Sequence, residues 1–194
     1  MEIITPQLLL YGYSQGVFPM DDEGKIYWYD PDPRAIIPLD ERFHVPHSLA
    51  RTIRRDGFEV RVDTAFRATM EACGATTATR SETWISPELV DLYTQLHEAG
   101  FAHSVETWRD GALVGGLYGV ALGGMFAGES MWSRERDASK VALVALVERL
   151  RAGGFVLLDT QFMTAHLARF GAHEIPRAEY RRRLAAALQV QASF

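Results

Sequence analysis

The sequence has a single cysteine, Cys73, among its 194 residues. An internal disulfide and a cysteine-based zinc site are therefore excluded, and the six histidines show neither an HExxH motif nor paired-ligand spacing, so no metal is expected. The N-terminal segment lacks the basic start and apolar length of a signal peptide. No stretch reaches the roughly 18 apolar residues of a membrane span. We therefore expect a soluble protein of the reducing cytoplasm.

Positive charge is also in short supply. The 20 Lys and Arg residues are outnumbered by 25 Asp and Glu, which gives a formal net charge of −5. This balance argues against a surface that is basic throughout for nucleic acid. It allows one local basic patch, because a bound phosphate senses charges mostly within a Debye length of about 8–10 Å. The hydrophobic content of 47% is sufficient for one core of ordinary size.

The first part of the chain predicts a small unit of its own. Thr5 is a suitable N-cap, Pro6 takes the favoured first helical position, and Gly16 ends the predicted helix. The aromatic, proline-punctuated stretch 26–39 is expected to be extended. We expect residues 1–34 to form a small N-terminal domain and residues 35–194 a second, larger domain.

The larger part alternates between helical and strand patterns. Helix, strand and helix are predicted over 47–74, followed by a helix that Ser86 and Pro87 begin and Gly100 ends. Three runs of period two come next, separated by Asp110-Gly111 and by a glycine pair at 123–124, which predicts an antiparallel meander. A helix over 137–154, a buried strand over 155–162 and helices over 163–171 and 176–190 complete the pattern.

This order predicts an α/β (α+β) fold with a mixed, largely antiparallel sheet. It is compatible with the acyltransferase (GNAT-like) fold of N-acetyltransferases, although order alone fits several folds. Acetyl-CoA-dependent members hold the pyrophosphate on backbone N–H groups of a glycine-rich turn into the helix after the meander. Here the stretch from Ser133 to Leu150 contains no glycine. Coenzyme A is therefore not expected, and we expect no cofactor.

Two carboxylates mark the candidate site. Glu129 lies in the last meander strand, Asp159 lies near the end of the buried strand, and Gln161 follows on the same face of that strand. A buried aspartate is costly unless it is paired or lines a wet cleft. Each carboxylate alone is compatible with a structural role. Together, on neighbouring strands, they predict an acidic cleft for a cationic or amino substrate.

Two arginine clusters and one tryptophan allow two interpretations each. An arginine cluster on a helix is either a solvated face or a phosphate contact. The clusters consist of Arg51, Arg54 and Arg55, and of Arg177, Arg181, Arg182 and Arg183. Trp84, in a loop before a helix, is either part of the core or a platform on which a base stacks.

Several motifs together resemble one family. "YSQGVFP", "WYDPDPRAIIPL", "TWIS", the block from His97 to Lys140, "LLDTQF" and "HLARFGAHEIPR" resemble bacterial leucyl/phenylalanyl-tRNA–protein transferase, in order and with compatible spacing. The resemblance implies a small N-terminal domain followed by an acetyltransferase-like domain. It implies transfer of Leu or Phe, and less readily Met, from aminoacyl-tRNA to proteins that begin with Arg or Lys, which marks them for N-end-rule degradation. No DNA or membrane partner is implied.

The resemblance also implies roles for individual residues. The catalytic positions are Glu129, Asp159 and Gln161. The terminal adenosine and the cleft are contacted by Trp84, Met20 and Tyr13, the donor side chain is housed by Phe126, Leu117 and Leu158, and the tRNA acceptor stem is held by Arg54 and Arg55. Among the departures from the family pattern, Met20 stands where many members have Trp, and Thr164 stands where some have Asn.

Two other functions fit parts of the sequence. One is an acetyl-CoA-dependent N-acetyltransferase, against which the missing glycine loop argues. The other is a non-catalytic receptor for basic N-termini, which would use the acidic cleft but has no use for the basic pair or for Trp84.

Overall fold

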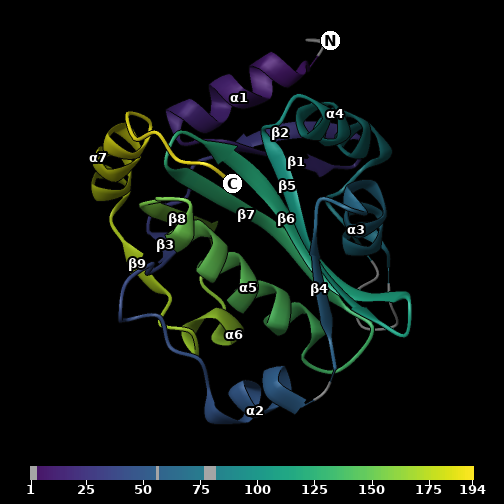
Figure 1. Ribbon diagram of the computed structural model, residues 1–194. Helices are drawn as coiled ribbons and strands as arrows, with labels where there is room; N and C mark the ends of the chain where they lie inside the picture. Colours follow the sequence, from purple (N-terminus) through teal and green to yellow (C-terminus); the bar gives the residue numbers. More distant parts are fainter. Residues whose placement is uncertain (1–3, 56, 77–81) are drawn as a thin grey trace.

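The computed structural model describes residues 4–55, 57–76 and 82–194 and contains two sheets with helices around them (Figure 1). The first sheet is the small hairpin of β1 (Phe18–Asp22) and β2 (Lys25–Tyr29), which follows helix α1 (Pro6–Gln15). The hydroxyl of Thr5 caps α1 by accepting the N–H of Leu8 at 3.2 Å, and Gly16 ends the helix with a left-handed φ of 84°. The predicted first helix is confirmed.

The second sheet has seven strands in the order β4-β5-β6-β7-β8-β3-β9. Its strands are β3 (Arg34–Ile37), β4 (Glu59–Val62), β5 (Ala102–Arg109), β6 (Ala112–Leu122), β7 (Met125–Ser133), β8 (Leu157–Gln161) and β9 (His173–Ile175). Every neighbouring pair is antiparallel except β7 and β8. The predicted meander is confirmed as β5-β6-β7, and Asp110 and Gly111 both have positive φ in its first turn.

Helices cover both faces of this sheet. They are α2 (His47–Arg55), α3 (Phe66–Gly74), α4 (Pro87–Glu98), α5 (Ala138–Ala152), α6 (Ala165–Ala168) and α7 (Arg177–Ala187). On β6, Tyr118 packs into one core with α1, α3, α4 and α7, while its neighbour Leu117 packs into a second core with α5. Successive side chains of a strand point to opposite faces of the sheet, so the sheet separates the interior into two cores. Among the described helices, none combines the length and the apolar character that crossing a membrane requires.

Three features near the β8-β3-β9 end of the sheet differ from the prediction. β3 leaves the N-terminal unit and inserts between β8 and β9, so residue Arg34 lies inside the large sheet. β9 is a three-residue strand in a stretch for which no strand was predicted. The helix predicted over 163–171 is reduced to the four residues of α6, where Thr164 caps the N-terminus by accepting the N–H of Leu167.

Candidate active site

A cavity of about 430 Å³ opens among β6, β7, β8, α5 and α6. Its apolar wall consists of Leu117, Met131, Leu143, Leu146, Leu158 and Leu167. Its polar wall includes Glu129, Thr160, Gln161, Thr164 and His166. The structure therefore brings together two of the predicted catalytic residues and two of the three residues predicted to house an apolar side chain.

The cavity lies where β7 and β8 separate. Their parallel pairing covers only three residue pairs and ends at Ala127 and Asp159. Glu129 and Gln161 each lie two residues beyond that last pair, Glu129 where the register of β6 and β7 shifts and Gln161 at a positive φ of 60°, and both line the cavity. The Nε2 of Gln161 lies 3.4 Å from Oε1 of Glu129. The two strands thus diverge and leave one carboxylate and one carboxamide at the same point of the cavity wall.

Glu129 is held by two tyrosines from the other core. The hydroxyl of Tyr93 in α4 donates to its Oε2 at 3.4 Å, and the hydroxyls of Tyr93 and Tyr13 share a short hydrogen bond. Burial raises the pKa of Glu129 to about 8, and the charge of Asp159 adds to the rise, while Tyr13 and Arg34 oppose it. Tyr13 is buried on α1, so the first helix contributes to the surroundings of Glu129.

Asp159 was expected to line the cleft, but its side chain is not part of the cavity wall. Its side chain is fully buried, and its carboxylate pairs with the guanidinium of Arg34, with Nε to Oδ1 at 2.9 Å and Nη2 to Oδ2 at 2.6 Å. The hydroxyl of Tyr180 donates to Oδ2 at 2.8 Å, and the backbone N–H of Gln161 donates to Oδ1 at 2.9 Å. The carboxylate turns to Arg34 because a buried carboxylate needs a counter-charge, and β3, the strand beside β8, carries that arginine.

The remaining predicted substrate contacts lie around the cavity or behind it. Phe126 is fully buried against Phe155 and is not part of the wall. Trp84 and Met20 are partly buried and pack on the same core, and the carbonyl of Trp84 accepts the N–H of Asp21, next to Met20, at 3.2 Å. The loop of Trp84 and the first strand of the hairpin therefore lie side by side.

The two arginine clusters have different partners. The four arginines of α7 each pair with a carboxylate, namely Asp30, Asp32 or Glu179. No ion pair joins Arg51, Arg54 or Arg55 of α2 to any acidic residue within the described ranges, which leave out residue 56. Within the described residues these charges are not neutralised by a carboxylate, and a phosphate is an anion that such arginines bind.

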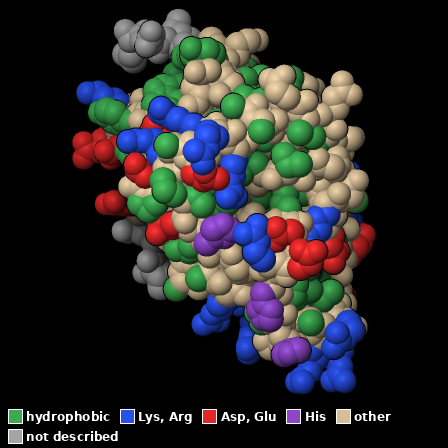
Figure 2. Space-filling model, turned by 90° about the vertical axis from the view of Figure 1, so that its left-hand side faces the viewer, with side chains coloured by type: hydrophobic (Ala, Val, Ile, Leu, Met, Phe, Trp, Pro, Cys, Tyr) green, Lys and Arg blue, Asp and Glu red, His purple; other side chains and the backbone are tan. Residues whose placement is uncertain are grey.

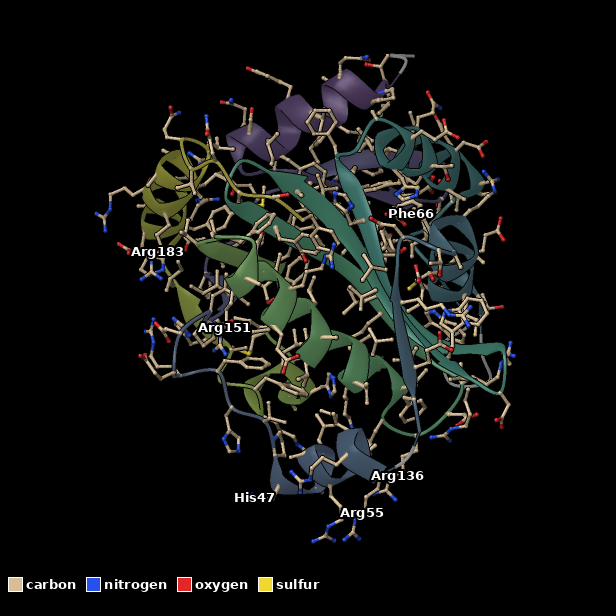
Figure 3. The ribbon with its side chains drawn as sticks, in the orientation of Figure 1. His47, Arg55, Phe66, Arg136, Arg151 and Arg183 are labelled. Atoms are coloured by element: carbon tan, nitrogen blue, oxygen red, sulfur yellow. The ribbon has the colours of Figure 1, made fainter. Side chains whose placement is uncertain are left out.

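The arginines of α2 lie at one end of the molecule. Figure 3 shows Arg55 and His47 directed away from the body, with Arg136 at the same end. Arg136 lies in the loop between β7 and α5, and its side chain is 94% exposed. Figure 2 shows basic side chains projecting from this lower end, whereas acidic and basic groups alternate higher on that face. The net negative charge of the chain is thus compatible with a local basic surface on α2.

One group of described residues has the chemistry of a metal site. Asp63, His97 and His103 offer ligand atoms within 4.8 Å of one another. The Nδ1 of His103 lies 2.8 Å from Oδ2 of Asp63, and the Nδ1 of His97 lies 2.8 Å from the carbonyl of Ala102. Facing these acceptors, both Nδ1 atoms carry hydrogens, so neither offers a lone pair to an ion. The arrangement is a hydrogen-bonded link between β5 and the residues beside it.

Sequence reasoning assigned no role to Arg34, Tyr93, Tyr180 or His166. A signal for Arg34 was available, because it stands in the otherwise apolar run "RAII", as Asp159 stands in "LLDT". A charged residue in a buried apolar strand needs a partner of opposite charge. Arg34 and Asp159 meet this need for each other. The tyrosines gave no such signal, because tyrosine is an ordinary core residue.

Comparisons with known proteins agree with this architecture. The family model described as the leucyl/phenylalanyl-tRNA protein transferase N-terminal domain matches residues 2–32, and the model described as leucyl/phenylalanyl-tRNA protein transferase matches residues 36–185. The C-terminal domain of a putative lysylphosphatidylglycerol synthetase from Agrobacterium fabrum superposes on 94% of this chain and 69% of its own, with a TM-score of 0.50 and 15% identity. The predicted fold class, a small N-terminal domain with a GNAT-like domain, is confirmed.

Two curated relatives match almost from end to end. The leucyl/phenylalanyl-tRNA–protein transferase of Herpetosiphon aurantiacus is 71% identical over 191 residues, which is 98% of each chain. That of Paramagnetospirillum magneticum is 59% identical over 197 residues, covering 100% of this chain and 94% of the relative. With both family models and these relatives matched, the chain belongs to the leucyl/phenylalanyl-tRNA protein transferase family.

Proposed function

We propose that this chain transfers leucine or phenylalanine, and less readily methionine, from aminoacyl-tRNA to the α-amine of proteins that begin with arginine or lysine. The observation that carries the proposal is the apolar cavity of about 430 Å³ that ends at Glu129 and Gln161. An apolar donor side chain suits the leucines of its wall, and a cationic acceptor suits the carboxylate. The names of the relatives support the transfer from tRNA to protein.

Donor selection follows from the shape of the cavity. Leu117, Leu143, Leu146 and Leu158 are each almost fully buried and come from three different elements, so the wall is rigid. One methylene in such a pocket is worth about 1–3 kcal/mol. Large apolar side chains are therefore preferred over small ones, and a charged side chain is disfavoured among these leucines because they offer it no partner.

The acceptor brings two positive groups, its α-ammonium and its basic side chain. Glu129 is the carboxylate on the cavity wall that can answer this charge, since Asp159 is already paired with Arg34. An ammonium cannot attack a carbonyl, so it must first lose one proton. The positive charge of the acceptor favours the ionised form of Glu129. Its pKa, raised to about 8 by burial, lies close to that of an α-amine, about 7.7–8.0. Glu129 is thus matched to accept that proton.

The transfer itself needs positioning and little else, because an aminoacyl ester is already activated. The amine nitrogen attacks the ester carbonyl, a C–N bond forms, the C–O bond to the ribose breaks, and the departing ribose oxygen takes a proton from the nitrogen. The carboxamide of Gln161, next to Glu129, orients the reacting amine. Holding two reactants in this geometry is worth roughly 7–11 kcal/mol in ideal cases.

The remaining parts of the proposal concern tRNA and location. Arg54 and Arg55 of α2 hold the acceptor stem, supported by the absence of carboxylate partners for them within the described residues. Trp84 and Met20 lie near the terminal adenosine, supported by their neighbouring backbones. We place the boundary of the two domains at residues 34 and 35, close to the gap between the two family matches, and the protein in the cytoplasm, as part of N-end-rule degradation.

Neither alternative function has an observation in its favour. At the start of α5, the hydroxyl of Ser133 already accepts the N–H of Ser139 at 2.8 Å, and the carboxylate of Asp137 binds Lys140. A pyrophosphate of coenzyme A would meet a negative charge there in place of a glycine loop. A receptor for basic N-termini would not need the apolar cavity beside Glu129.

The proposal is tested by transfer of labelled phenylalanine from Phe-tRNA to a peptide that begins with arginine. The matched control is the same peptide with an acetylated N-terminus, and a second control supplies acetyl-CoA in place of the charged tRNA. Transfer from the tRNA to the free amine alone is the expected result. Acetylation of the peptide, or binding of the peptide without transfer by folded protein and fresh donor, would contradict the proposal.

A further inference from the structure

The buried pair of Arg34 and Asp159 connects three parts of the molecule. The side chain of Arg34 is 1% exposed, and its guanidinium lies between the rings of Phe18, at 4.9 Å, and Tyr180, at 4.3 Å. Its Nη1 donates to the carbonyl of Gly16 at 2.9 Å, while Nε and Nη2 bind Asp159. Contacts from the N-terminal domain, from β8 and from α7 therefore meet at one guanidinium.

Asp159 has no capacity left for a substrate. A carboxylate offers about four acceptor positions. Those of Asp159 receive two hydrogen bonds from Arg34, one from Tyr180 and one from the backbone N–H of Gln161. The carboxylate is also absent from the cavity wall. Asp159 can therefore neither bind the acceptor ammonium nor take its proton without breaking this set of bonds.

Gln161 is the residue that these bonds hold. Its φ of 60° lies in the left-handed region, which is unfavourable for a residue with a Cβ. The bond from its N–H to Asp159 fixes this turn, and its backbone pairs with Ala35, the neighbour of Arg34 in β3, at a β-bulge. The turn directs the side chain of Gln161 into the cavity, toward Glu129.

We propose that Arg34 is a positioning residue of the transfer site, which acts through Asp159 to hold Gln161 in its left-handed turn. The fork of the guanidinium sets the orientation of the carboxylate, and the carboxylate sets the orientation of the Gln161 backbone. Asp159 is thereby an anchor, whereas Glu129 remains the group that handles the amine. The N-terminal domain contributes to catalysis through Gly16 and Phe18, which complete the environment of Arg34. This inference rests on the transferase function proposed above.

The experiment uses transfer from Phe-tRNA to the arginine peptide and separates kcat from KM. Arg34→Lys keeps the positive charge but loses the fork. We expect its kcat to fall about 100-fold, while the KM values for Phe-tRNA and peptide stay within about threefold, because neither substrate touches Arg34. Tyr180→Phe removes one hydrogen bond to Asp159 without exposing a charge, and its kcat should fall several-fold. The matched control is Arg61→Lys, which alters an ion pair of β4.

Thermal melting accompanies each assay. A folded Arg34→Lys or Tyr180→Phe protein with the wild-type kcat would overturn the inference, and so would a loss confined to KM. If Arg34→Lys fails to fold, Tyr180→Phe alone decides between these results. Failure of the transferase function is distinguishable, since the wild-type protein itself would then show no transfer.

Discussion

Replacing Glu129 by glutamine should change how the stability of the protein depends on pH. Burial raises the pKa of Glu129 from its ordinary value of 4.5 to about 8. Between these two values the folded protein holds a proton that the unfolded chain has lost. The stability that goes with this proton is fully present below pH 4.5 and is lost as the pH rises through about 8.

The magnitude follows from the difference between the two pKa values. If the full pKa difference contributed to the free energy of unfolding, the change in stability would be roughly 5 kcal/mol. Glu129 lies on a cavity wall and is partly exposed, so water reduces the cost of its charge, and we expect about 2 kcal/mol. Glutamine has the same shape and never ionises.

The assay is urea unfolding of the wild-type protein and Glu129→Gln at pH 5 and pH 9. The difference between the two proteins isolates Glu129 from all other titrating groups. Relative to the wild type, the variant should gain about 2 kcal/mol between pH 5 and pH 9. A difference that stays constant with pH would refute the reasoning, because Glu129 would then titrate alike in the folded and unfolded states.

Two further substitutions test the other charges. Asp159→Asn leaves Arg34 buried without a counter-charge, and urea unfolding should show a loss of about 3–5 kcal/mol; a loss below 1 kcal/mol would mean that the ion pair is not buried as described. Reversing Arg54 and Arg55 to glutamate should weaken tRNA binding and make the slope of log affinity against log salt less steep by about 2. The control is Arg182→Glu on α7, and an unchanged slope in the α2 variant would contradict the assignment.

Local signals in the sequence were sufficient to predict most of the helices and the meander. The first helix is specified by its cap and by its terminal glycine, and α4 by Ser86, whose hydroxyl accepts the N–H of Leu89. The meander is specified by turn residues that accept positive φ. In each of these cases the determining contacts lie within a few residues along the chain.

The features that were missed depend on contacts between distant parts of the chain. β3 and β9 are short, and only pairing with each other and with β8 makes them strands. The partner of Asp159 lies 125 residues away. The charge of Arg34 in an apolar run was a signal for this pair, but the pairing of β3 beside β8, which brings the two residues together, was not predicted. The expected acidic cleft consequently has one carboxylate on its wall where two were expected.

The central claim, that the cavity beside Glu129 and Gln161 receives the donor side chain, is tested most directly by filling it. Leu167 lies on α6 at the cavity wall, where it is partly exposed and packs on the edge of the second core, so the indole of Leu167→Trp can extend into the cavity. We predict that kcat/KM for Phe-tRNA falls more than tenfold in this variant, while tRNA binding stays unchanged. Unchanged transfer of phenylalanine by the folded variant would contradict the account.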